Sequence, residues 1–306
     1  MMRGKSGFTL LELTVVLAIL GIIGGAMGTL LLRQQRFYRG ASELLYARQG
    51  VRDALEVLAT DLRGISVADT VRLLADSAIE IFGAIGGSVV CQGVGGSEVG
   101  LPAASASDNT LTWFLSQPDT GDLAVFYRGD VANVGDWERH RINGFGSRSL
   151  ASTCPASSGL ARDEEAVAGR QGFQVGLDAP LSSVVRPGAP VRFVRRGRYS
   201  LYRASDGDWY LGYRRCNAIG FSVCGAIQPL SGPYRSYSGN PATSGLLFEY
   251  FDSHGARLDA ASSPLDLARI DISARAESRH HLGVEGHTFT PSDSATLSIA
   301  IRNRQL

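Results

Sequence analysis

The stretch Gly7-Phe8-Thr9-Leu10-Leu11-Glu12 decides the fold, because it opens an apolar run that ends at Leu32. Glu12 is the one ionisable side chain between Phe8 and Leu32. As a helix with a rise of ~1.5 Å per residue, this run would span roughly 37 Å, enough to cross a ~30 Å hydrocarbon core. The sequence therefore predicts a membrane-spanning helix over residues 8–32.

The segment before this run is short and basic. Residues 1–7 carry Arg3 and Lys5 and no acidic side chain. A cationic flank ahead of an apolar segment stays on the cytoplasmic side of the membrane. A secretory signal peptide is cleaved after its apolar core, at small residues, whereas here the small residue Gly7 precedes the core. We therefore expect a cytoplasmic leader over residues 1–7; the alternative is a simple uncleaved anchor.

Glu12 separates these two interpretations. A carboxylate deep in a membrane helix costs about 2.5–3.5 kcal/mol or more and usually marks a function. The basic leader, Gly7, Phe8 and Glu12, followed by an unbroken apolar helix, resemble the processing site of type IV prepilins and type II secretion pseudopilins. The resemblance implies that a prepilin peptidase cleaves between Gly7 and Phe8 and methylates the new amino terminus of Phe8.

The resemblance also implies how the subunit assembles. Cleavage would leave a positive ammonium group on Phe8 inside an apolar bundle, and Glu12 of a neighbouring subunit is its natural counter-ion. Each charge alone in a dry core is unfavourable, whereas the paired charges largely offset each other. The implied partners are other pilins, the prepilin peptidase, an inner-membrane assembly platform and membrane lipid. The implied location is a single pass of the inner membrane with the bulk outside the cytoplasm.

Composition restricts the other classes of function. Removing Arg3 and Lys5 from the 30 basic side chains leaves 28 against 29 acidic ones, so no bulk charge indicates nucleic acid as a partner. The sequence has no G-x-S-x-G, P-loop or H-E-x-x-H motif, so we expect neither an enzyme nor a cofactor. An anchored extracytoplasmic enzyme is kept as an alternative.

The four cysteines, Cys91, Cys154, Cys216 and Cys224, all follow the membrane segment. Disulfides persist outside the cytoplasm. Cys216 and Cys224 close a short loop and are the preferred pair, which leaves Cys91 to pair with Cys154. Four cysteines allow three connectivities, so this remains a preference. A zinc site is the competing interpretation, although no C-x-x-C spacing supports it.

Beyond the membrane, residues 33–65 continue the helix with an amphipathic pattern and no proline. Its apolar stripe comprises Phe37, Ala41, Leu44, Val51, Leu55, Leu58, Leu62 and Ile65. Such a stripe predicts packing against the protein's own sheet, with a coiled coil as the alternative. In the membrane half, glycines cluster at positions 21, 24, 25 and 28. They suit either close helix packing or a segment that bends during assembly.

Residues 66–306 are predicted to form a β-rich extracytoplasmic domain. The candidate strands are 79–82, 110–115, 123–128, 173–177, 191–195, 198–203, 209–213, 246–251, 268–275 and 295–302. The last two alternate apolar and polar residues, as half-buried strands do. Ser205-Asp206-Gly207-Asp208 between two of the strands predicts a hairpin turn. A long helix laid on an antiparallel sheet gives an α+β fold, with residues 83–109 and 143–172 as long loop insertions.

The order of elements in the C-terminal half resembles PilW-type minor pilins and J-type pseudopilins. The resemblance therefore implies a minor pilin or pseudopilin that acts in initiation or tip assembly of a filament. Bulky loops argue against an abundant shaft subunit.

Two further groups of residues are candidates for binding. Arg195-Arg196-Gly197-Arg198 with Arg214-Arg215 could form a nucleic-acid-binding stripe on a tip subunit, although solvated hairpin edges are the simpler interpretation. The candidate metal ligands are His280, His281, His287, Asp119, Asp122, Asp206 and Asp208. Adjacent histidines point apart and paired aspartates are common in turns, so we expect no metal.

Overall fold

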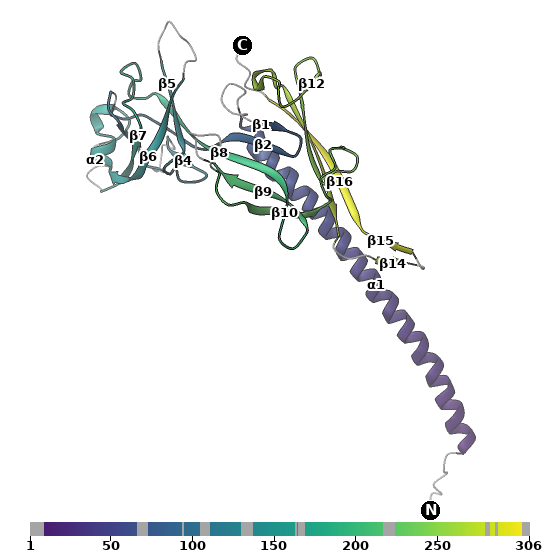
Figure 1. Ribbon diagram of the computed structural model, residues 1–306. Coiled ribbons are helices and arrows are strands. Elements are labelled where there is room, and N and C mark those ends of the chain that lie inside the picture. The colour runs from purple at the N-terminus through teal and green to yellow at the C-terminus, as the bar shows by residue number, and fades with distance from the viewer. Residues whose placement is uncertain are drawn as a thin grey trace, which may run out of the picture.

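The computed structural model describes residues 9–65, 73–93, 95–104, 111–129, 137–162, 164, 169–216, 224–278, 282–284 and 287–301. A single long helix, α1 (Leu10–Arg63), carries a β-rich head at its C-terminal end (Figure 1). The 54 residues of α1 correspond to a rod of about 80 Å. The α+β class predicted from the sequence is confirmed.

The two halves of α1 have different environments. The C-terminal half packs on the head and buries Ala47, Gly50, Val51, Ala54, Leu58, Ala59 and Leu62. The N-terminal half projects away from the head (Figure 1) and leaves its large apolar side chains exposed. The head therefore covers only the part of the rod that lies beyond about residue 43.

The predicted apolar stripe is correct from Val51 onward and wrong at its start. Val51, Leu58 and Leu62 are buried against the sheet, whereas Phe37 is 72% exposed. The difference arises because the contacts between head and helix end near Glu43, which accepts a hydrogen bond from Ser278. Phe37 lies beyond this edge and has no sheet to pack on.

The described strands form one large antiparallel sheet and a separate hairpin. The strands are β1 (Leu73–Ala75), β2 (Ala78–Val89), β3 (Glu98–Leu101), β4 (Trp113–Phe114), β5 (Leu123–Tyr127), β6 (Trp137–Ser149), β7 (Gln171–Leu177), β8 (Pro190–Arg203), β9 (Trp209–Arg215), β10 (Gln228–Tyr234), β11 (Leu246–Phe251), β12 (Arg257–Leu258), β13 (Arg269–Glu277), β14 (Leu282–Val284), β15 (His287–Phe289) and β16 (Ser292–Ala300). The short helices are α2 (Leu150–Thr153) and the 3-10 turns Ala156–Ser158 and Pro264–Asp266.

Two long strands, β2 and β8, form the spine of this sheet. They pair along almost their whole length, with a bulge between Ala84 and Gly86. On its other edge, β8 pairs first with β5 and then with β9. Because its partner changes part-way along the strand, the sheet divides into two parts that share the β2–β8 ribbon.

Each part has its own hydrophobic core. We call residues 84–195 the distal lobe; its core lies among β2, β3, β5, β6, β7 and β8. We call residues 40–83 and 196–301 the proximal lobe; its core contains the C-terminal half of α1 and residues of β2, β8, β9, β10, β11, β13 and β16. The distal lobe, with β4 to β7 and α2, stands to one side of the helix axis (Figure 1). The head is therefore asymmetric about the rod.

The glycine-rich segments predicted to be loops are in part strands, which is a correction. Gly83-Ala84-Ile85-Gly86-Gly87-Ser88 lies within β2, and residues 143–149 continue β6. The glycines of β2 make room for large neighbours, because a Cβ on Gly86 would lie 2.5 Å from the Phe114 ring and one on Gly87 would lie 2.9 Å from the Trp113 indole. Close approach of a neighbouring ring is a recognised reason for glycine within a strand.

Other sequence predictions are confirmed. The turn with Gly207 at φ +90° joins β8 to β9, with Arg203 opposite Trp209. The two alternating segments near the C-terminus pair with each other as β13 and β16, with Ile270 opposite Ile299. The predicted strands 191–195 and 198–203 are one continuous strand, β8.

Candidate functional site

The N-terminal end of α1 is closed by a capping box made of Thr9 and Glu12. The Glu12 backbone N–H donates to Thr9 Oγ1 (3.3 Å), and the Thr9 backbone N–H donates to Glu12 Oε2 (3.0 Å). This reciprocal arrangement satisfies donors that a helix start leaves unpaired. Thr9 was not singled out in the sequence analysis, although the T-x-x-E spacing is the signal that identifies it.

One oxygen of the Glu12 carboxylate, Oε2, accepts both hydrogen bonds that the carboxylate makes with Thr9. The second of these comes from the Thr9 hydroxyl (3.1 Å), and Oε1 has no hydrogen-bond partner within the described residues. The negative charge at the start of the helix is favoured by the helix dipole. Glu12 is therefore held in position by Thr9 of its own chain and still offers Oε1 to a donor from outside the described residues.

The helix that follows is uncovered and apolar. Leu10 is 82% exposed and Ile22 is 73% exposed, and the head buries no residue of the most apolar 18-residue stretch of α1. Among the described helices, α1 is the one long and apolar enough to cross a membrane. These side chains need lipid or the helices of other subunits around them.

The four glycines of this half pack against no other segment among the described residues. A Cβ built on Gly21, Gly24, Gly25 or Gly28 would meet nothing within 4 Å. They are thus available to neighbouring helices, which small residues allow to approach closely in lipid. Both the packing and the bending interpretation of the cluster stay predictions.

The processing site itself, Gly7 and Phe8, lies outside the described residues. A family model described as the prokaryotic N-terminal methylation motif matches residues 2–28, which span the leader, this site and most of the apolar run. The N-terminus therefore carries the prepilin-type methylation motif, which supports a type IV pilin-like protein. The match ends at residue 28, so it does not test the resemblance of the C-terminal half to the PilW and J types. The search of curated proteins and the search of solved structures each found no match.

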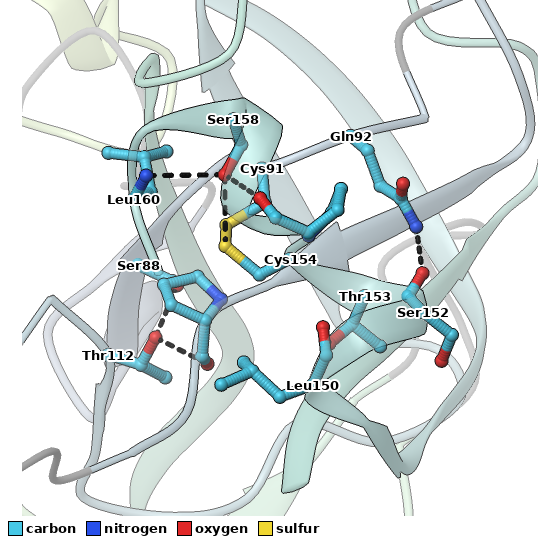
Figure 2. Close-up of a disulfide and its surroundings, with 12 residues drawn as sticks. Ser88, Cys91, Gln92, Thr112, Leu150, Ser152, Thr153, Cys154, Ser158 and Leu160 are labelled. Atoms are coloured by element: carbon cyan, nitrogen blue, oxygen red, sulfur yellow. Dashed lines mark hydrogen bonds between the residues drawn. A yellow bond between two sulfur atoms is a disulfide. The ribbon is translucent and has the colours of Figure 1, made fainter. Parts of the chain in front are cut away.

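The pilin's cysteines form the two preferred disulfides, Cys91–Cys154 and Cys216–Cys224. All four cysteines are used in these bonds, so none is free to bind zinc as a thiolate. Figure 2 shows Cys91–Cys154 packed beside Leu150 in a small core of the distal lobe. The bond joins the segment after β2 to the turn after α2, 63 residues apart, and therefore restrains the lobe at this edge.

Four of the five arginines of the predicted stripe, Arg195, Arg196, Arg198 and Arg215, form ion pairs within the head, so most of the charge of the stripe is neutralised inside the chain. Arg196 is buried and donates to Glu80 Oε1 (2.6 Å), while Arg198 donates to Glu80 Oε2 (2.7 Å). These contacts join β2 to β8, with the Glu80 and Arg196 side chains buried and the Arg198 side chain partly exposed. Buried charges are tolerated when they are paired in this way.

The second half of the stripe is neutralised by Asp122. Arg195 donates to both Asp122 oxygens (3.0 and 2.7 Å), and Arg215 donates to Oδ1 (3.1 Å). The hydrogen bond to Asp122 raises the pKa of Arg195 above its ordinary value. The Thr120 N–H and then Arg215 lower the pKa of Asp119. With two guanidinium groups on Asp122, this pair of aspartates is not arranged to hold calcium.

The remaining metal candidates are the aspartates of the β8–β9 turn and three histidines near the C-terminus. Asp206 accepts from the Asp208 backbone N–H (3.1 Å) and from the Tyr210 hydroxyl (2.7 Å), as expected for a turn. His280 and His281 lie outside the described residues.

Replacing Glu80 by glutamine tests the buried network. The Glu80→Gln variant keeps the shape of the side chain but removes the negative charge that Glu80 places beside the buried Arg196. We expect the free energy of unfolding of the head to fall by about 3–5 kcal/mol in chemical denaturation. The matched control is Glu249→Gln, whose partner Arg257 is 56% exposed, and its effect should stay below about 1 kcal/mol. Equal effects of the two variants would contradict a structural role for Glu80.

Proposed function

We propose that this pilin is a minor pilin or pseudopilin that is cleaved between Gly7 and Phe8, N-methylated at Phe8, and used in the initiation or tip complex of a type IV pilus-like filament. The observation that carries the proposal is the uncovered apolar half of α1, in which Glu12 is the single carboxylate. A structural role of this kind needs no catalytic residues and no cofactor. The prepilin peptidase and an inner-membrane assembly platform are the partners that processing and insertion require.

The geometry at Glu12 supports pairing between subunits. Within one chain, the carboxylate is positioned by Thr9 and retains Oε1 for another donor. The methylated ammonium of Phe8 from a neighbouring subunit supplies both the charge and the N–H that this oxygen lacks. Because this charge pair forms only at one axial offset between adjacent helices, it stabilises that offset over others in an apolar bundle.

The shape of the head supports a position at the tip or in the initiating complex. The distal lobe stands to one side of the rod (Figure 1) and has its own core. A shaft subunit repeats along the filament and must accommodate neighbours around its whole head, whereas a terminal subunit can carry a large lateral lobe.

The disulfides support a location outside the cytoplasm for the head. Two disulfides without a free cysteine suit an oxidising compartment. With a cytoplasmic leader, this gives a single-pass inner-membrane protein before assembly. A pseudopilin of type II secretion shares the processing site and remains the second candidate for the machine that this subunit serves.

Mass spectrometry of the mature chain tests processing. We expect the chain to begin at Phe8 and to carry one extra methyl group. A Gly7→Val variant should stay unprocessed, because the resemblance requires a small residue before the cleaved bond, while Gly4→Val in the same leader should be processed normally. A wild-type chain recovered with Met1 at its start, or trimmed beyond Leu32, would rule out the proposal.

Two substitutions at Glu12 separate capping from charge pairing. Glutamine preserves a capping box, whereas alanine removes both the cap and the charge. We expect both Glu12→Gln and Glu12→Ala to lose most of their incorporation into filaments or into a complex with other pilins. Incorporation is measured as the amount of the variant that co-purifies with these pilins from membranes. Thr9→Ser, which keeps cap and carboxylate, is the control and should assemble normally. If Glu12→Gln assembles as the wild type does, Glu12 acts only as a cap.

A further inference from the structure

The outer face of the distal lobe carries a row of residues contributed by neighbouring strands. Residues directly opposite in antiparallel strands place their side chains on the same face. The register aligns Trp113 of β4 with Gly87 of β2, Gly87 with Arg192 of β8, Arg192 with Val125 of β5, and Val125 with Arg139 of β6. At ~4.8 Å between strands, the row is about 19 Å long. The core of the lobe lies on the opposite face, where Phe126 and Phe193 are buried.

At one end of the row, Trp113 lies flat on the sheet. A Cβ on Gly87 would lie 2.9 Å from the indole Nε1 and 3.2 Å from Cε2, so the ring covers the position where Gly87 has no side chain. Trp113 is nevertheless 48% exposed. One face of the indole is thus supported by backbone, and much of the residue is open to solvent. Such a ring is a rigid stacking surface.

A second aromatic group flanks the row. Tyr127 and Trp137 are opposite each other on β5 and β6, two residues along from Val125 and Arg139. Their rings pack edge to face with centroids 5.3 Å apart. The Arg192 guanidinium lies 4.9 Å from the centre of the Trp137 ring, which holds this cation above the sheet.

The positive charges of this face differ from those of the ion-pair network. Arg192 and Arg141 have no carboxylate partner among the described residues, and both are exposed. Arg141 lies two residues along β6 from Arg139, on the same face. Asp178 borders this region, but it accepts from the Arg141 backbone N–H (3.0 Å) and lies beside His140. Arg192 and Arg141 therefore have charge available for an anionic partner.

We propose that this aromatic and arginine face of the distal lobe, built from Trp113, Tyr127, Trp137, Arg141 and Arg192, binds single-stranded nucleic acid. Unpaired bases stack on exposed aromatic rings, and phosphates pair with arginine, which are the two elements that the face combines. A duplex hides the faces of its bases, and a sulfated polysaccharide offers charge without flat bases. The face lies on the lobe that stands away from the membrane helix (Figure 1), where a long polymer can reach it.

Binding to the full mature pilin in nonionic detergent micelles tests this proposal. The probe is a fluorescently labelled oligothymidylate of about 15 nucleotides, followed by anisotropy over a series of salt concentrations. We expect binding that weakens with salt, and at least about five-fold weaker binding for Trp113→Ala. Trp113→Phe should retain most of the affinity, because a phenyl ring still stacks. Arg192→Gln should weaken binding and reduce the salt slope by about 0.7, as expected for one lost phosphate contact.

The proximal lobe supplies a matched control. Arg269 lies 4.2 Å from the centre of the Phe251 ring, a cation–π contact of the same kind as that of Arg192. Arg269→Gln should leave oligonucleotide binding unchanged. Tryptophan fluorescence gives a second readout, because two of the three tryptophans, Trp113 and Trp137, lie on the proposed face. Oligothymidylate should quench the wild-type fluorescence, and Trp113→Phe should show less quenching despite its retained affinity.

Several results would overturn the proposal. They are no binding of the oligonucleotide, equal binding by Trp113→Ala with an unchanged melting temperature, or equal losses in Arg192→Gln and Arg269→Gln. Duplex DNA or heparin bound as tightly as the single strand would show a general polyanion surface instead. None of these measurements depends on filament assembly, so the proposal is tested independently of the proposed function.

Discussion

The uncovered apolar half of α1 is the constraint on which the rest of the structure depends. A run of leucine, isoleucine and valine from Leu10 to Leu32 is incompatible with water, and the head contributes nothing to cover it. In the proposed function, lipid covers it before assembly and the helices of other subunits replace lipid afterwards. Glu12 is the one ionisable side chain of this run, and its charge must be compensated in an apolar surrounding, which is why we propose that it sets the offset between neighbouring helices.

The head is organised around the other half of the same helix. Small residues let the helix approach the sheet closely: a Cβ on Gly50 would lie 3.8 Å from that of Ala276. Two tyrosines fix this contact, since Tyr234 donates to the Gly50 carbonyl (2.7 Å) and Tyr199 donates to Asp61. Burial raises the pKa of Tyr234 to about 12, so this donor keeps its proton over the physiological range. The described residues of the distal lobe make no hydrogen bond of this kind to α1.

The sequence was sufficient for features that depend on local chemistry. The processing motif, the length of the helix, the β8–β9 hairpin and the alternation in β13 and β16 are all encoded in consecutive residues. The preferred cysteine pairs followed from loop length. Where partners come from distant strands, the sequence was insufficient. The glycines of β2 led to the prediction of a loop, because the rings that occupy the space beside them, Trp113 and Phe114, belong to another strand. The arginines of β8 resembled a binding stripe because Glu80 and Asp122 lie far away in sequence.

The central claim is that the Phe8 amine of one subunit meets Glu12 of its neighbour. The leader contains the only lysine, Lys5, so the processed chain has no amine except its amino terminus. Treatment of assembled filaments or pilin complexes with an apolar carbodiimide joins an amine directly to a carboxylate with loss of water. If the pair forms, denaturing gels will show a covalent dimer whose Arg-C peptides join the Phe8 nitrogen to Glu12, and the dimer will be absent from Glu12→Gln. A cross-link confined to single chains, or dimers joined at other carboxylates, would contradict the pairing.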